Sequence, residues 1–153
     1  MGAKNFQKIA VVAVLFALAA CSGSAPTPEV GIKIGKPYEV NGQTYYPEAV
    51  DDGGYEKTGD ASWYGPGFHG KKTASGERFN ENDITAAHPT LPMPSLVLVT
   101  NLQNNKMVVV RVNDRGPFHS NRIIDLSKKS AQMIGMTHTQ PVHIKFLKKE
   151  TDG

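Results

Sequence analysis

Residues 95–118 read SLVLVTNLQNNKMVVVRVNDRGPF, and this stretch decides the fold class of the chain. Residues 96–100 and 107–112 are runs of β-branched and apolar residues, and the polar segment 103–105 lies between them. This arrangement predicts two strands joined as a hairpin. Both runs are too uniformly apolar for a sheet with one wet face. We therefore expect the strands to close into a small barrel.

The sequence on both sides of this hairpin adds shorter elements. Residues 84–87 predict a short strand, and residues 141–147 predict a last strand with alternating apolar side chains. One helix is predicted over residues 128–134, because Ser127 can cap its start and Gly135 can end it in a left-handed conformation. The fold class is therefore mainly β, with one or two short helices.

A second hairpin is predicted ahead of the barrel. Residues 38–40 and 43–46 flank Asn41-Gly42, the dipeptide that best tolerates the positive φ angles of a type I′ turn. A lone hairpin is marginally stable in water, so we expect its tyrosines to lean on the following domain. The Asp-Asp-Gly-Gly sequence at residues 51–54 predicts a linker.

The N-terminus has the pattern of an export signal. Lys4 and Lys8 precede an apolar run over residues 9–20. As a helix this run would cover roughly 18 Å, against a hydrocarbon core of about 30 Å. It is typical of the apolar region of a signal peptide. A buried core helix is the alternative, and nothing in the sequence supplies its partner.

The export signal ends at the only cysteine of the chain. Leu18-Ala19-Ala20-Cys21 resembles a bacterial lipobox, in which the cysteine is acylated and becomes the first mature residue. A lipid thioether accounts for a single unpaired thiol in an exported protein. The alternative is ordinary cleavage that leaves a free thiol. Ser22 resembles the pattern that sends lipoproteins to the outer membrane, facing the periplasm.

Charge excludes one class of function. The 153 residues include 17 Lys and Arg against 14 Asp and Glu, and two of the lysines lie in the export signal. The remaining chain is close to neutral and has no basic stripe. We therefore exclude a nucleic-acid-binding protein.

Three stretches carry side chains suited to chemistry. Residues 61–70 hold the only tryptophan, Trp63, among aromatics and glycines, which favours stacking on sugar rings; a packed strand–turn corner is the alternative. Glu77 follows a glycine turn and His88 ends a strand, positions at which barrels place function. Taken alone, Glu77 is more typical of a solvated carboxylate, and His88 is more typical of a turn residue whose hydrogen bonds are satisfied.

The third stretch runs from the apolar strand into a Gly-Pro turn. Asp114 ends that strand, and its alternative role is a turn aspartate that bonds its own backbone. Arg111, Arg115 and Asp125 form an alternative structural ion-pair set, and that interpretation is favoured for Arg122 and Asp125. The spacing of His69 and His88 matches no known metal-ligand pattern.

Taken together, two carboxylates, an imidazole and aromatic platforms on one barrel are suited to cleaving a glycosidic bond. A carboxylic acid held partly neutral protonates the leaving oxygen, and a second group stabilises the oxocarbenium charge that develops.

Longer motifs carry a resemblance to a known family. They are SWYGPGFHGKKTASGERFN (62–80), TAAHPTLPMPSLVLVTNL (85–102), VVVRVNDRGPF (108–118) and RIIDLS (122–127), preceded by KPYEVNGQTYYPE (36–48). Over roughly residues 35–147 the chain resembles the rare-lipoprotein-A (RlpA) family. The resemblance implies a six-stranded double-psi β-barrel, related to expansins and barwin.

The same resemblance implies a lytic transglycosylase, a lyase that acts on peptidoglycan glycan strands, in some members on strands without stem peptides. It cleaves the bond between N-acetylmuramic acid and N-acetylglucosamine and leaves 1,6-anhydro ends, without a metal or organic cofactor. The family's catalytic acid, histidine and aspartate fall on Glu77, His88 and Asp114. We assign Asp114 as the general acid/base, with Glu77 as the alternative acid, and expect Glu77 and His88 to orient the substrate, tune that acid or share proton transfer. We expect six residues to contact the substrate: Trp63, Tyr64, His69, Thr73, Ser75 and Arg115.

The expected organisation follows from these patterns. Residues 1–20 are a lipoprotein signal peptide, 21–30 a tether, 31–57 an extension with the hairpin, 58–148 the barrel and 149–153 a tail. We expect a monomer anchored to the membrane through Cys21. Many RlpA proteins carry a C-terminal SPOR domain that binds glycan, and too few residues follow the last predicted strand for one here. An expansin-like binding module and a structural lipoprotein remain the alternatives to an enzyme.

Overall fold

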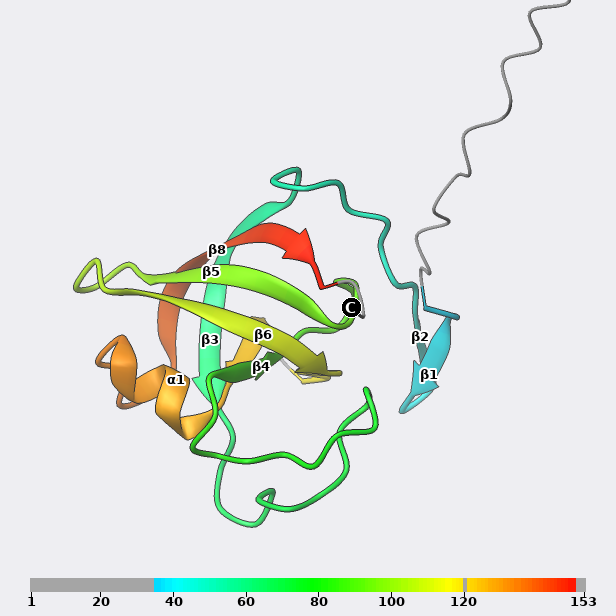
Figure 1. Cartoon of the computed structure of the whole chain (residues 1–153), viewed down its shortest axis with the longest axis horizontal. Coiled ribbons are helices and arrows are strands. Elements are labelled where there is room, and N and C mark those ends of the chain that lie inside the picture. Colours follow the sequence, from blue (N-terminus) through cyan, green and yellow to red (C-terminus); the bar gives the residue numbers. More distant parts are fainter. Residues whose placement is uncertain (1–34, 120, 151–153) are drawn as a thin grey trace, which may run out of the picture. The chain divides into compact units, whose positions relative to one another are not determined.

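The computed structural model describes residues 35–119 and 121–150. The predicted signal peptide, the lipidated Cys21 and the tether lie outside these residues. The elements in chain order (Figure 1) are β1 (Tyr38–Val40), β2 (Gln43–Tyr45), β3 (Glu56–Trp63), β4 (Thr85–Ala87), β5 (Ser95–Asn101), β6 (Met107–Asp114), β7 (Arg122–Leu126), α1 (Lys128–Met133) and β8 (Gln140–Lys149).

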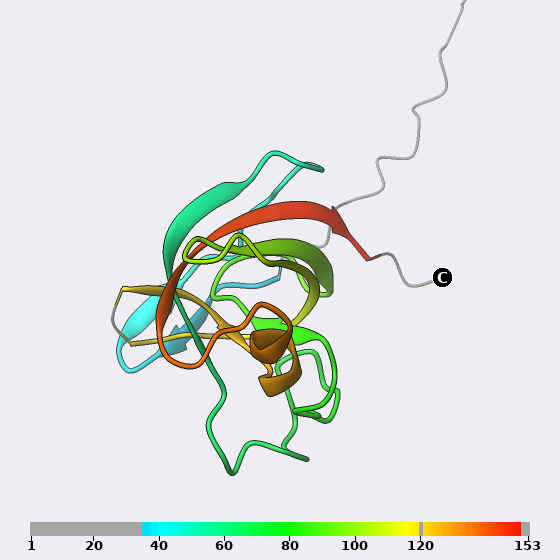
Figure 2. The same ribbon diagram turned by 90° about the vertical axis from the view of Figure 1, so that its left-hand side faces the viewer.

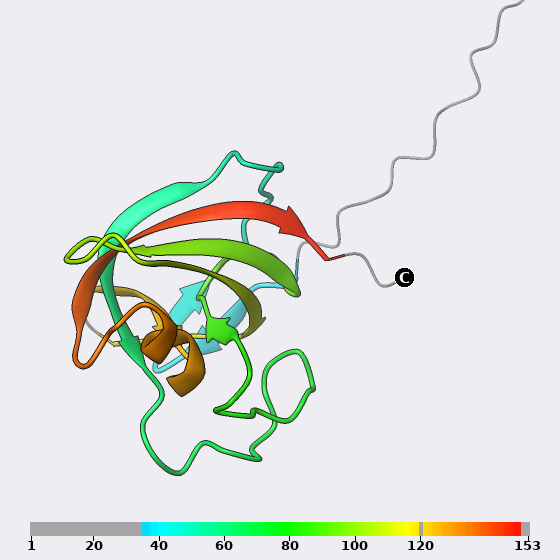
Figure 3. The ribbon, with the colours of Figure 1, turned by 60° about the vertical axis from the view of Figure 1, so that its left-hand side comes forward.

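Six of the strands close into a barrel in the order β3-β7-β4-β6-β5-β8. The pairs β3–β7 and β4–β6 are parallel, and the other four neighbouring pairs are antiparallel. Figures 2 and 3 show the strands curving around one closed interior, with the long loop between β3 and β4 extending below it. The prediction of a closed six-stranded barrel is confirmed.

The central hairpin is confirmed as well. β5 and β6 pair antiparallel, with Val99 opposite Val108. Val97 and Val110 point inward and are fully buried. The outer face differs from the expectation, because Met107 and Val109 are 61% and 44% exposed. The uniformly apolar sequence therefore reflects a filled barrel interior on one face only, and part of the outer face of β6 meets solvent.

The barrel interior forms one hydrophobic core. Its larger fully buried side chains come from β5, β6, β7 and β8 and from two residues outside the strands: Leu91, Val97, Val99, Val110, Val112, Ile124, Leu126, Ile134, Val142, Ile144 and Phe146. A small barrel is stable only when such side chains fill its interior. The rigid wall that results holds the polar side chains at the ends of the strands in fixed positions.

Helix α1 has the predicted ends. The hydroxyl of Ser127 accepts a hydrogen bond of 3.1 Å from the backbone N–H of Ser130 and so caps the first turn. Gly135 follows the helix with a φ of +65°, in the left-handed region that favours glycine. The helix packs on the barrel beside β3, β6 and β7 (Figure 1).

The N-terminal hairpin is confirmed in both its turn and its contacts. Asn41 and Gly42 have φ angles of +52° and +78°, as a type I′ turn requires. Tyr45 packs edge-on against Phe118 at 5.3 Å between ring centroids, and Tyr38 donates a hydrogen bond of 2.7 Å to the carbonyl of Pro89. The hairpin therefore packs against the barrel loops.

Over the described ranges, no helix is long and apolar enough to cross a membrane.

Candidate active site

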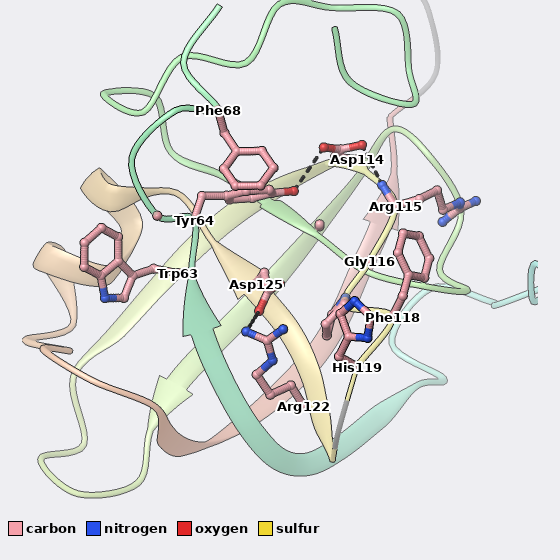
Figure 4. Close-up of a pocket in the computed structure, with 13 residues that line it drawn as sticks. Trp63, Tyr64, Phe68, Asp114, Arg115, Gly116, Phe118, His119, Arg122 and Asp125 are labelled. Atoms are coloured by element: carbon pink, nitrogen blue, oxygen red, sulfur yellow. Dashed lines mark hydrogen bonds and ion pairs between the residues drawn. The ribbon is translucent and has the colours of Figure 1, made fainter. Parts of the chain in front are cut away.

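A hollow of about 340 Å³ opens where β3, β4 and β6 end, beside β7 (Figure 4). Aromatic, acidic and basic side chains share it, as is usual for a binding site. The lining residues are Trp63, Tyr64, Gly65, Phe68, Ala87, Asp114, Arg115, Gly116, Pro117, Phe118, His119, Arg122 and Asp125. Three of the predicted substrate contacts, Trp63, Tyr64 and Arg115, therefore meet the predicted acid in one pocket.

Asp114 is held by three hydrogen-bond donors. Its Oδ1 accepts from the backbone N–H groups of Ala74 and Arg115, both at 2.8 Å. Its Oδ2 accepts from the phenol of Tyr64 at 3.0 Å (Figure 4). The contact with the Arg115 N–H is the local turn bond expected of an aspartate at a strand end. The other two donors come from distant loops and fix the carboxylate at the rim of the pocket.

The Ala74 donor is presented by a tight turn. The backbone N–H of Thr73 donates to the carbonyl of Glu77 at 2.8 Å, and that of Gly76 donates to the carbonyl of Thr73 at 3.0 Å. Gly76 has a φ of +94°, which a residue with a side chain adopts only with strain. The backbone N–H of Ser75 donates to the carbonyl of Asn113 at 3.2 Å and so joins the turn to β6.

Glu77 binds to the outer side of β6, outside the pocket lining. Both of its carboxylate oxygens accept from Arg111 Nη1 at 2.7 Å, and Oε2 also accepts from Asn113 at 2.9 Å. Partial desolvation acts to raise the pKa of Glu77, but the hydrogen bonds from Arg111 and Asn113 and the charge of Arg111 together lower it. Glu77 is thus a charged anchor between the 73–77 turn and the strand that carries Asp114.

His88 follows β4, next to the residue paired with Asp114, and is only 1% exposed. Its Nδ1 accepts from the backbone N–H groups of Thr90 and Leu91 at 3.2 and 3.0 Å, so the neutral ring carries its proton on Nε2, 3.3 Å from the hydroxyl of Tyr55. Burial lowers the pKa of His88 to about 3. The backbone N–H of His88 donates to the carbonyl of Asp114 at 3.1 Å.

Arg115 supports the wall of the pocket through its guanidinium. Nη1 donates to the carbonyls of Leu91 and His88 at 2.6 and 3.2 Å. The guanidinium also lies 5.8 Å from the centroid of the Tyr38 ring. Figure 4 shows it pointing away from the Asp114 carboxylate. Burial lowers the pKa of Arg115, and the charge of the Asp114 carboxylate opposes this.

Trp63 contacts both the hydrophobic core and the pocket. It packs on the hydrophobic core, as a strand-end corner residue does. It also lines the pocket and a second hollow beside α1, which Lys128, Gln132 and Met136 share. Tyr64 lies between two phenylalanines, at 5.5 Å from Phe68 and 4.6 Å from Phe79 between ring centroids.

Three predicted substrate contacts lie outside the pocket lining. His69 accepts a long hydrogen bond of 3.4 Å from the Glu81 N–H. Thr73 and Ser75 bond each other through their hydroxyls at 3.0 Å within the turn below Asp114. Within residues 35–119 and 121–150, no three acidic, histidine or cysteine side chains gather in a way that could hold a metal ion.

The pocket also contains residues that the sequence analysis assigned elsewhere or passed over. Arg122 pairs with Asp125, with Nη1 3.3 Å from Oδ1, as the ion-pair interpretation predicts, and both line the pocket. The larger set was wrong, because Arg111 instead pairs with Glu77 and Glu150. Phe68 and Phe118 also line the pocket, although neither was predicted to contact the substrate. The sequence feature that could have identified Phe68 is its place in the aromatic stretch 61–70.

Comparison with known proteins identifies the family. A family model described as "Lytic transglycolase", a double-psi β-barrel domain, matches residues 56–146. The chain belongs to this family. The fold is therefore the double-psi β-barrel, and the resemblance to RlpA proteins is confirmed.

Curated relatives named "Endolytic peptidoglycan transglycosylase RlpA" are similar over most of the chain. The protein from Campylobacter jejuni is 59% identical over 114 residues, which are 73% of this chain and 41% of that protein. The protein from Rickettsia felis is 52% identical over 125 residues, 78% of this chain and 54% of that protein. The protein from Neisseria meningitidis is 54% identical over 110 residues, 71% and 45% of the two chains. The chain thus spans about half the length of these relatives.

Proposed function

We propose that the chain is a lytic transglycosylase that cleaves the bond between N-acetylmuramic acid and N-acetylglucosamine in peptidoglycan glycan strands. The observation that carries the proposal is Asp114, a carboxylate oriented by three donors at the rim of an aromatic-lined pocket. Family membership and relatives named as peptidoglycan transglycosylases support the same substrate.

Asp114 acts as the general acid/base of the reaction. As an acid it gives a proton to the glycosidic oxygen, and as a base it takes the proton of the muramoyl 6-hydroxyl when that oxygen closes on C1. No water is consumed, and the new end is a 1,6-anhydro sugar. Trp63, Tyr64 and Phe68 offer ring faces or edges to the sugar rings, because aromatic surfaces pack well on their apolar C–H faces.

Glu77 and His88 lie outside the pocket lining and act on Asp114 through the residues that hold it. Glu77 ties the 73–77 turn to β6, and that turn supplies the Ala74 N–H to the carboxylate. His88 holds the backbone at Asp114 and, through its carbonyl, the guanidinium of Arg115. We assign both as positioning residues. His69, Thr73 and Ser75 support the same loop, and Arg115 shapes the wall of the pocket.

We further propose that the protein works as a monomer in the bacterial envelope, anchored to the outer membrane through a lipid on Cys21 and facing the periplasm. The lipobox-like sequence before Cys21 supports the anchor. Labelled palmitate should enter the exported protein but not its Cys21→Ser variant. A protein that takes up no label would exclude the lipid anchor, and the proposed transglycosylase activity of the barrel would still stand.

The enzymatic proposal is tested on purified sacculi, both intact and stripped of stem peptides by an amidase. The full chain should release fragments with anhydro-muramoyl ends, detected by mass spectrometry, and Asp114→Asn should not. Protein that sediments with glycan and releases nothing would instead support an expansin-like binding module.

A further inference from the structure

Asp114 shares its pocket with a second carboxylate, on a neighbouring part of the barrel wall. β4 lies between β6 and β7, and Ala87 is paired with Asp114 on one side and with Asp125 on the other. Adjacent strands lie about 4.8 Å apart, so the two aspartates start roughly 10 Å apart across one alanine. All three residues line the pocket. Ala87, which lies between them on β4, carries only a methyl group.

The two carboxylates have opposite surroundings. Asp114 accepts three hydrogen bonds, whereas Asp125 faces one cation, Arg122, at 3.3 Å. That contact is an ion pair without hydrogen-bond geometry, and Oδ1 of Asp125 is buried with no hydrogen-bond partner in the described part of the chain. Burial raises the pKa of Asp125, and the charge of Arg122 only partly opposes this.

A glycosidic bond is cleaved most readily between two groups in different protonation states. Enzymes that use two carboxyl groups on a sugar place them about 5–9.5 Å apart. The environments of such a pair assign the acid to the group whose ionised form is less stabilised and the base to the group whose ionised form is better stabilised. Asp125 has the environment of the acid, and Asp114 has the environment of the base.

We infer that Asp125 is a second catalytic residue of this pocket and takes over the acid half of the role assigned above to Asp114. Asp125 supplies the proton to the leaving sugar, and Asp114 acts only as the base. The inference rests on the proposed transglycosylase function. Asp125 gives its proton to the glycosidic oxygen as the bond from muramoyl C1 breaks, freeing the 4-hydroxyl of N-acetylglucosamine. Asp114 takes the proton of the 6-hydroxyl as O6 bonds to C1. One proton is given and one is taken, and exchange with solvent restores both side chains.

Several other groups share the pocket with Asp125 and bear on its titration. Arg122 lies on the same strand, Tyr64 follows β3, and Asp114, Arg115 and His119 come from the end of β6 and the loop after it. Arg122 is the cation whose charge lowers the pKa of Asp125. Activity that needs protonated Asp125 falls as the pH rises through its pKa, so removing Arg122 should move this alkaline limb to higher pH.

The test compares two substrates that differ in their leaving group. One is peptide-stripped glycan, and the other is an aryl glycoside of N-acetylmuramic acid, whose phenolate leaves without being protonated. Loss of a general acid costs about 10²–10⁴-fold. Asp125→Asn should lose at least about a hundredfold on glycan and much less on the aryl glycoside, whereas Asp114→Asn should lose activity on both. Asp52→Asn, on an exposed aspartate outside the pocket, is the matched control.

Each outcome decides the inference. Activity of Asp125→Asn close to wild type on glycan, or equal losses on both substrates, overturns the role of Asp125 and leaves the proposed function standing. A wild-type protein that forms no anhydro ends on either substrate overturns the proposed function itself. Should Asp125→Asn fail to fold, Arg122→Gln carries the test: an alkaline limb that does not move to higher pH overturns the inference.

Discussion

The phenol of Tyr64 and the carboxylate of Asp114 meet at 3.0 Å although their strands are not neighbours in the barrel. Tyr64 follows β3, Asp114 ends β6, and β7 and β4 lie between these two strands. Burial, followed by the charge of Asp114, raises the pKa of Tyr64 far above its usual range. The phenol therefore stays protonated and donates to Asp114 across the mouth of the pocket.

Removing this donor should slow catalysis while leaving the fold intact. A hydrogen bond to a charged group contributes about 1.5–3 kcal/mol, so Tyr64→Phe should lower kcat by roughly 10–100-fold. In this variant the Asp114 carboxylate keeps its two backbone donors, the N–H groups of Ala74 and Arg115, and these limit the loss. Tyr46→Phe, at a tyrosine that is 66% exposed, is the control. Equal activity of the two variants would show that Tyr64 does not orient Asp114.

Glu77→Gln should weaken the turn that presents the Ala74 N–H, so its effect on kcat should exceed its effect on stability. The Glu77 side chain is 42% exposed, and its ion pair with Arg111 stabilises the fold by no more than about 1 kcal/mol. Because the folded-state pKa of Glu77 is lowered, this stability is present above the unfolded pKa and disappears as the pH falls through the folded value.

The measurement is the thermal midpoint of wild type and Glu77→Gln between pH 7 and pH 3, together with kcat at neutral pH. The difference in midpoint should shrink in acid. Glu150→Gln removes the other carboxylate partner of Arg111 without touching the turn, and it should keep kcat. A Glu150→Gln variant as impaired as Glu77→Gln would assign the effect to Arg111 and not to the turn.

His88 should stay neutral and resist titration. Its pKa is lowered to about 3 by burial, whereas the unfolded chain takes up the proton near pH 6.5. The unfolded state therefore binds more protons between these values, and the stability of the wild-type protein should fall as the pH is lowered from about 6.5 toward 3. Nitrogen NMR should find an imidazole with Nε2 protonated and no titration between pH 5 and 8.

His88→Ala should remove that pH dependence and destabilise the fold. It leaves the N–H groups of Thr90 and Leu91 without their acceptor, which costs about 1–3 kcal/mol in a buried site. Urea unfolding at pH 7 and pH 5 measures both effects, with the exposed His138→Ala as control. An imidazole that titrates near pH 6.5 would contradict a positioning role and favour direct proton transfer by His88.

Trp63→Ala should weaken binding of glycan more than it slows the chemical step. The indole lines both the pocket and the hollow beside α1, so it can contact a strand that extends past the cleavage point. Stacking of this kind contributes about 1 kcal/mol, which predicts KM raised roughly 5–10-fold for long strands. Short fragments that end in the pocket should show a smaller change. An equal change in KM for glycan fragments of every length would show that Trp63 only packs in the hydrophobic core and does not contact the extended strand.

The barrel was predictable because its signals are local or repetitive. Asn41-Gly42 specifies its turn, Ser127 and Gly135 bound their helix, and the valines of β5 and β6 alternate into one interior. The exposure of Met107 and Val109 was not predictable, because a run of apolar residues does not record which face meets solvent. Asp114 was found through its motif and its place at a strand end.

The rest of the pocket depends on pairing between strands that are distant in the sequence. Asp125 reaches the pocket only because β7 lies between β3 and β4, and its i,i+3 spacing from Arg122 favoured a structural ion pair. Glu77 and His88 were identified, but their positions behind Asp114 come from the turn at 73–77 and from the burial of His88. These depend on tertiary contacts that local patterns do not specify.

The most direct test of the central claim follows cleavage of peptide-stripped glycan in water enriched in oxygen-18. The full chain should release 1,6-anhydro-muramoyl ends without the heavy isotope, because the muramoyl 6-hydroxyl and not water attacks C1. Asp114→Asn should sediment with the glycan as the wild type does and release no such ends. Reducing ends that carry oxygen-18, or anhydro ends formed equally by Asp114→Asn, would contradict the account.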